Sequence, residues 1–217
     1  MRKAVLFLTG RYRPRDFPFY RKLARGCFKV AVDGGYGFFR RSGLTVDLLI
    51  GDFDSLKRLP RRLSPKTVVA RFPVDKDKTD TELALDYCLN HGLSQIDLVQ
   101  PSLGDPDHFL ANLFSLTRTS DHSPSRKLRF RLVGPNYEAF SVENSRIRFR
   151  RARGSVVSVI PISASIVLTC RGTAFDVTLA RITRGQTRAT RNRITAADAW
   201  FTVTGKAFVI RHFSRQK

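Results

Sequence analysis

Residues 46–55 read Val-Asp-Leu-Leu-Ile-Gly-Asp-Phe-Asp-Ser, an apolar run that ends in two aspartates. The run predicts a buried strand over residues 46–50. Because side chains alternate across a strand, Asp52 and Asp54 should point to one side and Phe53 to the other. The paired carboxylates could then face one cation. Alternatively, the second aspartate or the serine after it is only the N-cap of a helix.

Three further acidic signatures follow strand-like runs in the same part of the chain. They are Asp33-Gly34-Gly35, the segment 75–82 (Asp-Lys-Asp-Lys-Thr-Asp-Thr-Glu), and Asp107-His108. In a parallel α/β sheet such strand ends share one edge, where ligands bind. Converging carboxylates repel one another unless a cation lies between them, and Mg²⁺ binds through carboxylates and substrate phosphates. The sequence therefore predicts a metal-nucleotide site at this edge.

Local signals support that interpretation. Gly34 and Gly35 allow positive φ and a close backbone approach to a ligand, although they could form only a tight turn. Thr79-x-x-Glu82 is a capping box, so a helix should begin there and end near Gly92. The free N–H groups of its first turn suit phosphate. The Asp-His pair taken alone is weak evidence for catalysis.

The order of elements predicts two domains. Strands are expected over residues 3–8, 28–32, 46–50, 67–72 and 95–100, with helices over 17–25, 38–42, 79–92 and 106–116. A polar linker covers 117–127, and short strands are then expected over 129–133, 147–149, 156–160, 166–169, 175–179, 200–203 and 208–210. We therefore expect a Rossmann-like parallel-sheet α/β domain over residues 1–122. An antiparallel β-sandwich should follow over residues 126–217.

Composition narrows the function classes. The 217 residues carry no apolar run of membrane-spanning length, so no membrane association is expected, and the basic start reads as a first strand. Three widely spaced cysteines favour reduced thiols in the cytoplasm over disulfides or zinc. No Walker A, G-x-G-x-x-G or G-x-S-x-G sequence is present.

The net charge of +21 is concentrated after Ser120, in a segment that contains 19 basic and 5 acidic residues. A basic surface attracts polyanions, so nucleic acid has to be considered as a partner. The simpler interpretation is a soluble basic protein with solvated arginines.

Together the four signatures resemble those of the thiamine pyrophosphokinase (thiamine diphosphokinase) family, including the segments 47–55, 77–82 and 107–113. Their order, their spacing and the β-rich second part agree along nearly the whole chain. The resemblance implies a nucleotide domain, a β-sandwich, and a homodimer with acceptor sites at the subunit interface. It also implies that Mg²⁺ and ATP serve to transfer pyrophosphate to the hydroxyl of thiamine, with release of AMP, in thiamine diphosphate biosynthesis.

The resemblance also assigns candidate site residues. The expected catalytic residues are Asp52, Asp54, Asp77, Asp80 and Asp107, of which the first four would hold metal. Nucleotide or phosphate contacts are expected from Asp33, Gly34, Gly35, Lys78, Thr79 and His108. Acceptor contacts are expected from Phe175 and Asn192, although core packing is the alternative for Phe175. Either Asp80 or Asp107 could accept the hydroxyl proton.

Two departures from the family pattern bear on the substrate. The family usually has Gly-Gly-Arg before its Asp-His, where residues 103–106 of this chain read Leu-Gly-Asp-Pro. The cation that this arginine would place near phosphate must therefore come from Lys76, Lys78 or an arginine of the second domain. Arg191 and Arg193 flank Asn192 where the family has Ser and Glu, and two cations disfavour a cationic thiazolium unless they point into solvent. A different hydroxyalkyl acceptor is therefore one alternative to thiamine. A non-catalytic nucleic-acid-binding relative is the other, which the retained aspartates disfavour.

Overall fold

The computed structural model describes residues 2–54, 63–101, 104–118 and 128–214. The chain divides into two compact units, Met1–Pro135 and Asn136–Lys217. Most of the expected linker, including the expected boundary between residues 122 and 126, lies outside the described residues.

The first unit is built on a parallel sheet. Its strands in the described residues are β1 (Arg2–Phe7), β2 (Phe28–Val32), β3 (Leu48–Gly51), β4 (Val68–Arg71), β5 (Leu93–Val99) and β6 (Arg129–Gly134), in the order β6-β5-β1-β2-β3-β4. All of their pairings are parallel. The carboxyl ends of the strands therefore share one edge, as the sequence predicted.

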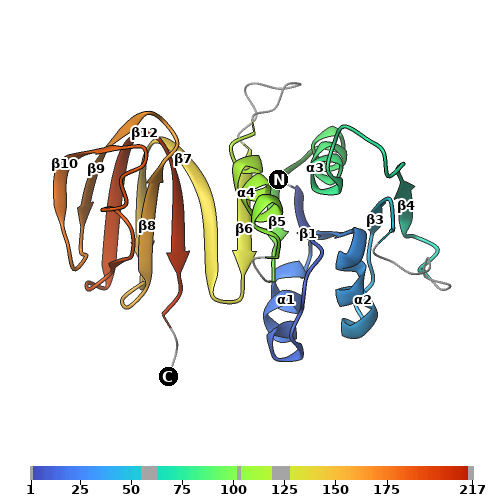
Figure 1. Cartoon of the computed structure of the whole chain (residues 1–217). Coiled ribbons are helices and arrows are strands. Elements are labelled where there is room, and N and C mark those ends of the chain that lie inside the picture. Colours follow the sequence, from blue (N-terminus) through green and yellow to red (C-terminus); the bar gives the residue numbers. More distant parts are fainter. Residues whose placement is uncertain (1, 55–62, 102–103, 119–127, 215–217) are drawn as a thin grey trace. The chain divides into compact units, whose positions relative to one another are not determined.

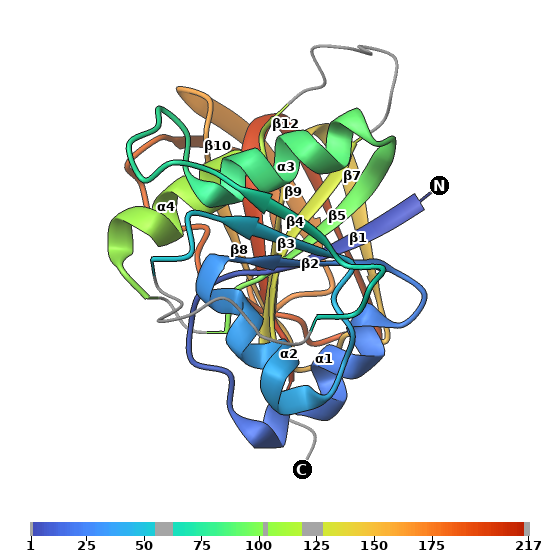
Figure 2. The same ribbon diagram turned by 90° about the vertical axis from the view of Figure 1, so that its right-hand side faces the viewer.

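Helices cover both faces of this sheet (Figure 2). They are α1 (Phe17–Ala24) and α2 (Tyr36–Ser42) on one face, and α3 (Asp80–Asn90) and α4 (Pro106–Ser115) on the other, with short 3₁₀ turns η1 (Pro14–Asp16) and η2 (Asp33–Gly35). Aromatic side chains fill the core beneath the first pair, where the ring of Phe7 stacks on that of Phe38 at 4.5 Å. Among the described helices, none is long and apolar enough to cross a membrane.

Strand β6 corrects one expectation. Residues 129–133 were predicted to begin the antiparallel group, but β6 pairs in parallel with β5. An ion triad around one buried carboxylate links the neighbouring strands: Asp97 on β5 lies 2.7 Å from the partly exposed Lys3 on β1 and 2.8 Å from the partly exposed Arg131 on β6. Because this carboxylate is only 3% exposed, its two cations offset the cost of burying it.

The second unit is all-β in its described residues and antiparallel (Figure 1). Its strands are β7 (Tyr137–Arg150), β8 (Val156–Pro161), β9 (Ser165–Arg171), β10 (Val177–Thr183), β11 (Asn192–Arg193) and β12 (Asp198–His212). β12 pairs with β7 along its length, with β9 over its first half and with β8 over its second half. Apolar side chains of these strands form a core of their own.

Four expected strands differ from those observed. The runs 200–203 and 208–210 form one strand, because Gly205 (φ 94°) introduces a register shift and does not end the pairing. The run 147–149 is only the end of β7. The run 175–179 is displaced along the chain, so that Phe175 precedes β10.

The turn after β2 shows why a glycine is required. The positive φ that was expected at the two glycines falls instead on Asp33 (φ 44°). A Cβ atom on Gly35 would lie 1.9 Å from the carbonyl oxygen of Phe7. Gly35 therefore allows a close approach to β1, whereas the predicted approach of this turn to a ligand stays a prediction.

We expect Gly35→Ala to lower the free energy of unfolding by about 1–3 kcal/mol, because backbone must move to accommodate the methyl group. Gly37→Ala is the matched control, since a Cβ there meets nothing within 4 Å. In the helix α2 it should be neutral or stabilising by up to about 1 kcal/mol. Urea denaturation measures both variants, and equal stabilities would contradict the assignment.

Candidate active site

Three carboxylates converge at the carboxyl edge of the first unit's sheet. Asp33 follows β2, while Asp52 and Asp54 follow β3, and one ligand atom from each lies within 4.8 Å of the others. Asp33 is only 6% exposed, and its Oδ1 has no hydrogen-bond partner within the described part of the chain. A buried, unpaired carboxylate oxygen is costly unless a cation meets it.

A turn, and not a continued strand, puts the last two aspartates on the same side. Phe53 adopts a positive φ of 66° and is buried in the core. The Asp54 N–H then donates a hydrogen bond to Asp52 Oδ1 at 3.2 Å. The prediction that these two carboxylates share a side is confirmed, whereas Ser55 lies outside the described residues.

Lys76 connects this group to the start of α3. Its Nζ lies 2.7 Å from Asp52 Oδ2 and 3.2 Å from Asp80 Oδ1, and donates to the Pro73 carbonyl at 3.0 Å. The sequence predicted it only as one of several candidate cations, because Lys76 precedes α3 and its contact with Asp52 joins segments 24 residues apart. Because the site joins carboxylates, an ammonium group and a helix N-terminus, it can bind both a divalent cation and phosphate.

The charged groups at this site shift one another's pKa values. The hydrogen bond from Lys76 holds the pKa of Asp52 below its ordinary value. Desolvation alone would lower the pKa of Lys76, but its hydrogen bonds with Asp52 and Asp80 together raise it. Burial raises the pKa of Asp80, and the nearby Asp52 carboxylate adds to that rise. The lysine is therefore charged at neutral pH.

The other predicted residues occupy the same edge without joining the three-carboxylate group. Asp77 is exposed in the loop before α3, and Lys78 pairs with Asp86 at 2.8 Å. Thr79 caps α3 by accepting the Glu82 N–H at 3.2 Å, as its capping box predicted. In the first turn of α4 both Asp107 and His108 are exposed, and the aspartate accepts the N–H of the histidine at 2.8 Å.

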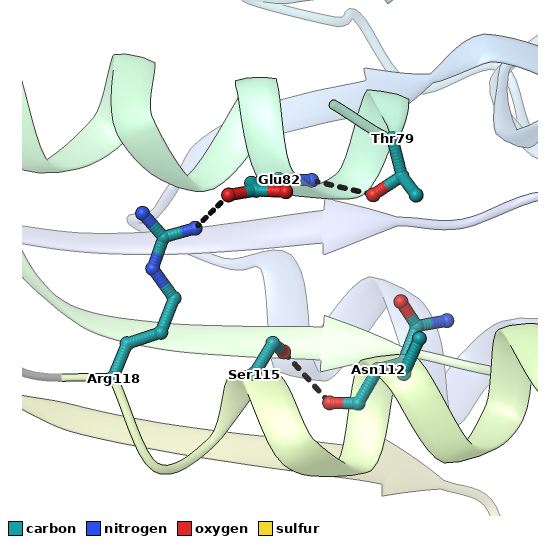
Figure 3. Close-up of a pocket in the computed structure, with 6 residues that line it drawn as sticks. Thr79, Glu82, Asn112, Ser115 and Arg118 are labelled. Atoms are coloured by element: carbon teal, nitrogen blue, oxygen red, sulfur yellow. Dashed lines mark hydrogen bonds and ion pairs between the residues drawn. The ribbon is translucent and has the colours of Figure 1, made fainter. Parts of the chain in front are cut away.

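A cavity of about 270 Å³ lies between α3 and α4 (Figure 3). It is lined by Thr79, Glu82, Ala111, Asn112, Ser115 and Arg118. Arg118 contacts Glu82 at 3.5 Å and also pairs with Asp86. Because the cavity borders the residue that caps α3, a molecule held at this N-terminus can extend into it. Of this lining only Thr79 was predicted as a site residue, since residues from two helices meet only in the fold.

A second pocket, of about 150 Å³, lies within the second unit and contains both predicted acceptor residues. Its lining includes Phe175, Val177, Arg188 and Asn192, with Leu168, Cys170, Ala180, Ile182, Ala189, Thr190 and Phe201. Phe175 is 74% exposed, so it is not a core residue. The Asn192 side chain accepts the Phe175 N–H at 3.2 Å and donates to its carbonyl at 2.8 Å, which holds the aromatic residue in place. Arg191 and Arg193 are both exposed.

The carboxylate group fits a hard divalent cation such as Mg²⁺. Asp33, Asp52 and Asp54 offer only oxygen ligands, which Mg²⁺ prefers. The unpartnered Oδ1 of Asp33 is the observation that carries this fit.

Comparisons with known proteins agree on one family. The family model described as "Thiamin pyrophosphokinase, catalytic domain" matches residues 20–128. The thiamine pyrophosphokinase of Bacillus subtilis (strain 168) is 28% identical over 174 residues, which cover 76% of this chain and 77% of that protein.

Solved structures extend the likeness in fold to almost the whole chain. The crystal structure of Bacillus subtilis thiamine pyrophosphokinase has a TM-score of 0.82 at 22% identity and covers 99% of this chain and 100% of its own. Candida albicans thiamin pyrophosphokinase has a TM-score of 0.73 at 15% identity, covering 98% of this chain and 89% of its own.

We expect Asp33→Asn to raise the free energy of unfolding of the metal-free protein by about 1 kcal/mol, because it removes an unpaired buried charge while asparagine tolerates positive φ. The same change should reduce the rise in melting temperature that Mg²⁺ gives the unaltered protein. Asp75→Asn, in the exposed part of the loop, should change neither quantity. Thermal melts with EDTA and with Mg²⁺ test this, and an undiminished Mg²⁺ effect in Asp33→Asn would refute it.

Proposed function

The chain belongs to the thiamin pyrophosphokinase family, and from that premise we propose that it transfers pyrophosphate from ATP to the hydroxyl of thiamine, giving thiamine diphosphate and AMP. The single observation that carries the proposal is the convergence of Asp33, Asp52 and Asp54 beside Lys76 at the N-terminus of α3. That combination suits a triphosphate with its divalent cation.

The proposed roles follow from position. Asp52 and Asp54 hold the cation with Asp33, and Asp80 lies next to them across Lys76. When bound, Mg²⁺ supplies neutralisation of charge on the phosphates and on the departing AMP. The N–H groups of the first turn of α3, which Thr79 caps, donate hydrogen bonds to phosphate oxygens. Catalysis of this kind depends mainly on positioning and electrostatics.

The acceptor hydroxyl attacks the β-phosphorus in line, and the bond from that phosphorus to the α–β bridging oxygen breaks, so that AMP leaves. A carboxylate takes the proton of the hydroxyl as the new bond forms. Asp80 is one candidate, since burial already raises the pKa of its carboxyl. Asp107 is the other, and it lies in the exposed first turn of α4. Three further residues are proposed to contact the phosphates or their metal ions, because of their charge or hydrogen-bonding capacity: Asp77, Lys78 and His108.

We assign the nucleotide to a Rossmann-like first domain and the acceptor to a sandwich-like second domain. The parallel sheet with helices on both faces supports the first assignment. The pocket at Phe175 and Asn192 supports the second, because an exposed aromatic ring on a backbone held by the Asn192 amide suits a flat heteroaromatic molecule.

A different hydroxyalkyl acceptor is the second candidate. Arg188 lines the pocket, and Arg191 and Arg193 are the sequence neighbours of Asn192, which also lines it. A neutral or anionic alcohol would avoid the repulsion that a thiazolium cation meets there. An assay that compares AMP release with thiamine and with other alcohols distinguishes the two candidates.

We further propose a cytoplasmic homodimer. The three buried cysteines, none of which pairs with another within the described residues, support the compartment. Leu110 and Phe114 lie four residues apart on α4 and are about half exposed, which supports a surface that a second copy covers. Light scattering of the purified protein measures the oligomeric state.

We expect the purified protein to release AMP and thiamine diphosphate from ATP, Mg²⁺ and thiamine. Asp54→Asn should lower turnover on the order of 100-fold or more, because it removes a carboxylate from the proposed cation site. Asp75→Asn removes an equal charge from the exposed loop and should keep nearly the full rate. Near-normal turnover in Asp54→Asn, with an unchanged melting temperature, would disprove the role of this carboxylate.

Phe175→Ala should raise KM for the acceptor about five-fold and leave KM for ATP unchanged, since a ring contact contributes about 1 kcal/mol. Leu179→Ala is the control: its side chain is also 74% exposed and lies in β10 but does not line the pocket. Both changes should leave stability unaltered. If the two variants have the same acceptor KM, Phe175 does not contact the acceptor.

A further inference from the structure

Three oxygens inside the candidate site surround the ammonium group of Lys76. The ammonium donates hydrogen bonds to Asp52 Oδ2 at 2.7 Å and to the Pro73 carbonyl at 3.0 Å, and it forms an ion pair with Asp80 Oδ1 at 3.2 Å. Its side chain is only 15% exposed. The ammonium therefore rests in a formed binding place, and not on a solvated surface.

That binding place overlaps the proposed metal ligands. Asp52 gives Oδ2 to Lys76, and its Oδ1 accepts the N–H of Asp54 at 3.2 Å. Each oxygen accepts one hydrogen bond in the free protein, so a divalent cation that binds Asp52 lies close to the ammonium and repels it. The unpartnered Oδ1 of Asp33 offers it one open ligand.

A displaced ammonium needs another anion. Lys76 lies three residues before Thr79, the N-cap of α3, so its flexible side chain is close to where a phosphate at that N-terminus would lie. Phosphate oxygens would replace the carboxylates as its partners. If metal bound without a nucleotide, the ammonium group of Lys76 would lose its carboxylate partners and gain none, which costs free energy.

We propose that Lys76 couples metal binding to nucleotide binding: its ammonium holds Asp52 and Asp80 in the free protein and transfers to the phosphates when metal and nucleotide arrive together. This inference rests on the proposed function. It predicts weak binding of metal alone and tighter binding of each ligand in the presence of the other, because coupling between two sites is reciprocal. Lys76 is thus a positioning residue for the metal and a direct contact of the nucleotide.

The test measures Mn²⁺ and α,β-methylene-ATP, whose α–β bridge resists cleavage, binding to the full chain. We expect Lys76→Met to bind Mn²⁺ alone about 5- to 10-fold more tightly than the unaltered protein, and to bind the analogue more weakly at saturating Mn²⁺ by a similar factor. Lys76→Gln, which retains hydrogen bonding without charge, should change both affinities in the same directions. Lys66→Met removes an equal charge from an exposed position before β4 and should change neither.

Opposite shifts in the two affinities are the decisive result, since a lysine that only stabilises the loop would weaken both when replaced. One outcome overturns the coupling and leaves the proposed function standing: the unaltered protein binds both ligands, and neither Lys76→Met nor Lys76→Gln binds Mn²⁺ alone more tightly than the unaltered protein does. If the unaltered protein binds neither ligand, the proposed function fails and the coupling with it.

Discussion

Electrostatic repulsion among aspartates at one edge of the sheet is the constraint on which the candidate site depends. Asp33, Asp52 and Asp54 place their ligand atoms within 4.8 Å of one another, and Asp80 adds its charge across Lys76. Like charges at this separation raise the free energy of the folded chain unless cations offset them. One lysine offsets part of that charge, and the buried Oδ1 of Asp33 has no hydrogen-bond partner within the described residues.

The backbone around these residues is specialised to bring them together. Asp33 and Phe53 both adopt positive φ, which is uncommon for residues other than glycine. Gly51 allows the two turns to meet, since a Cβ there would lie 3.0 Å from that of Asp33. Gly35 lets the turn after β2 sit against β1. Unfavourable conformations of this kind persist only where surrounding packing enforces them, and they often mark functional sites.

The second unit shows a different use of polar contacts. The Asn192 side chain accepts the N–H of Phe175 and donates to its carbonyl, so the backbone that carries this exposed ring keeps a defined position. Arg188 lines that pocket and adds a positive charge to it. Under the proposed function, specificity for the acceptor alcohol can change within this unit while the nucleotide-binding edge stays as it is.

The sequence by itself determined the elements of the first unit and the acidic edge, because apolar periodicity, capping residues and strand-to-turn junctions are local signals. Thr79 as a helix cap and the shared side of Asp52 and Asp54 are examples. Only the tertiary structure decided that β6 joins the parallel sheet, that residues 198–212 form one strand across Gly205, and that Lys76 bridges two carboxylates. Those features depend on pairing and distance between segments far apart in the chain, for which local propensity carries no information.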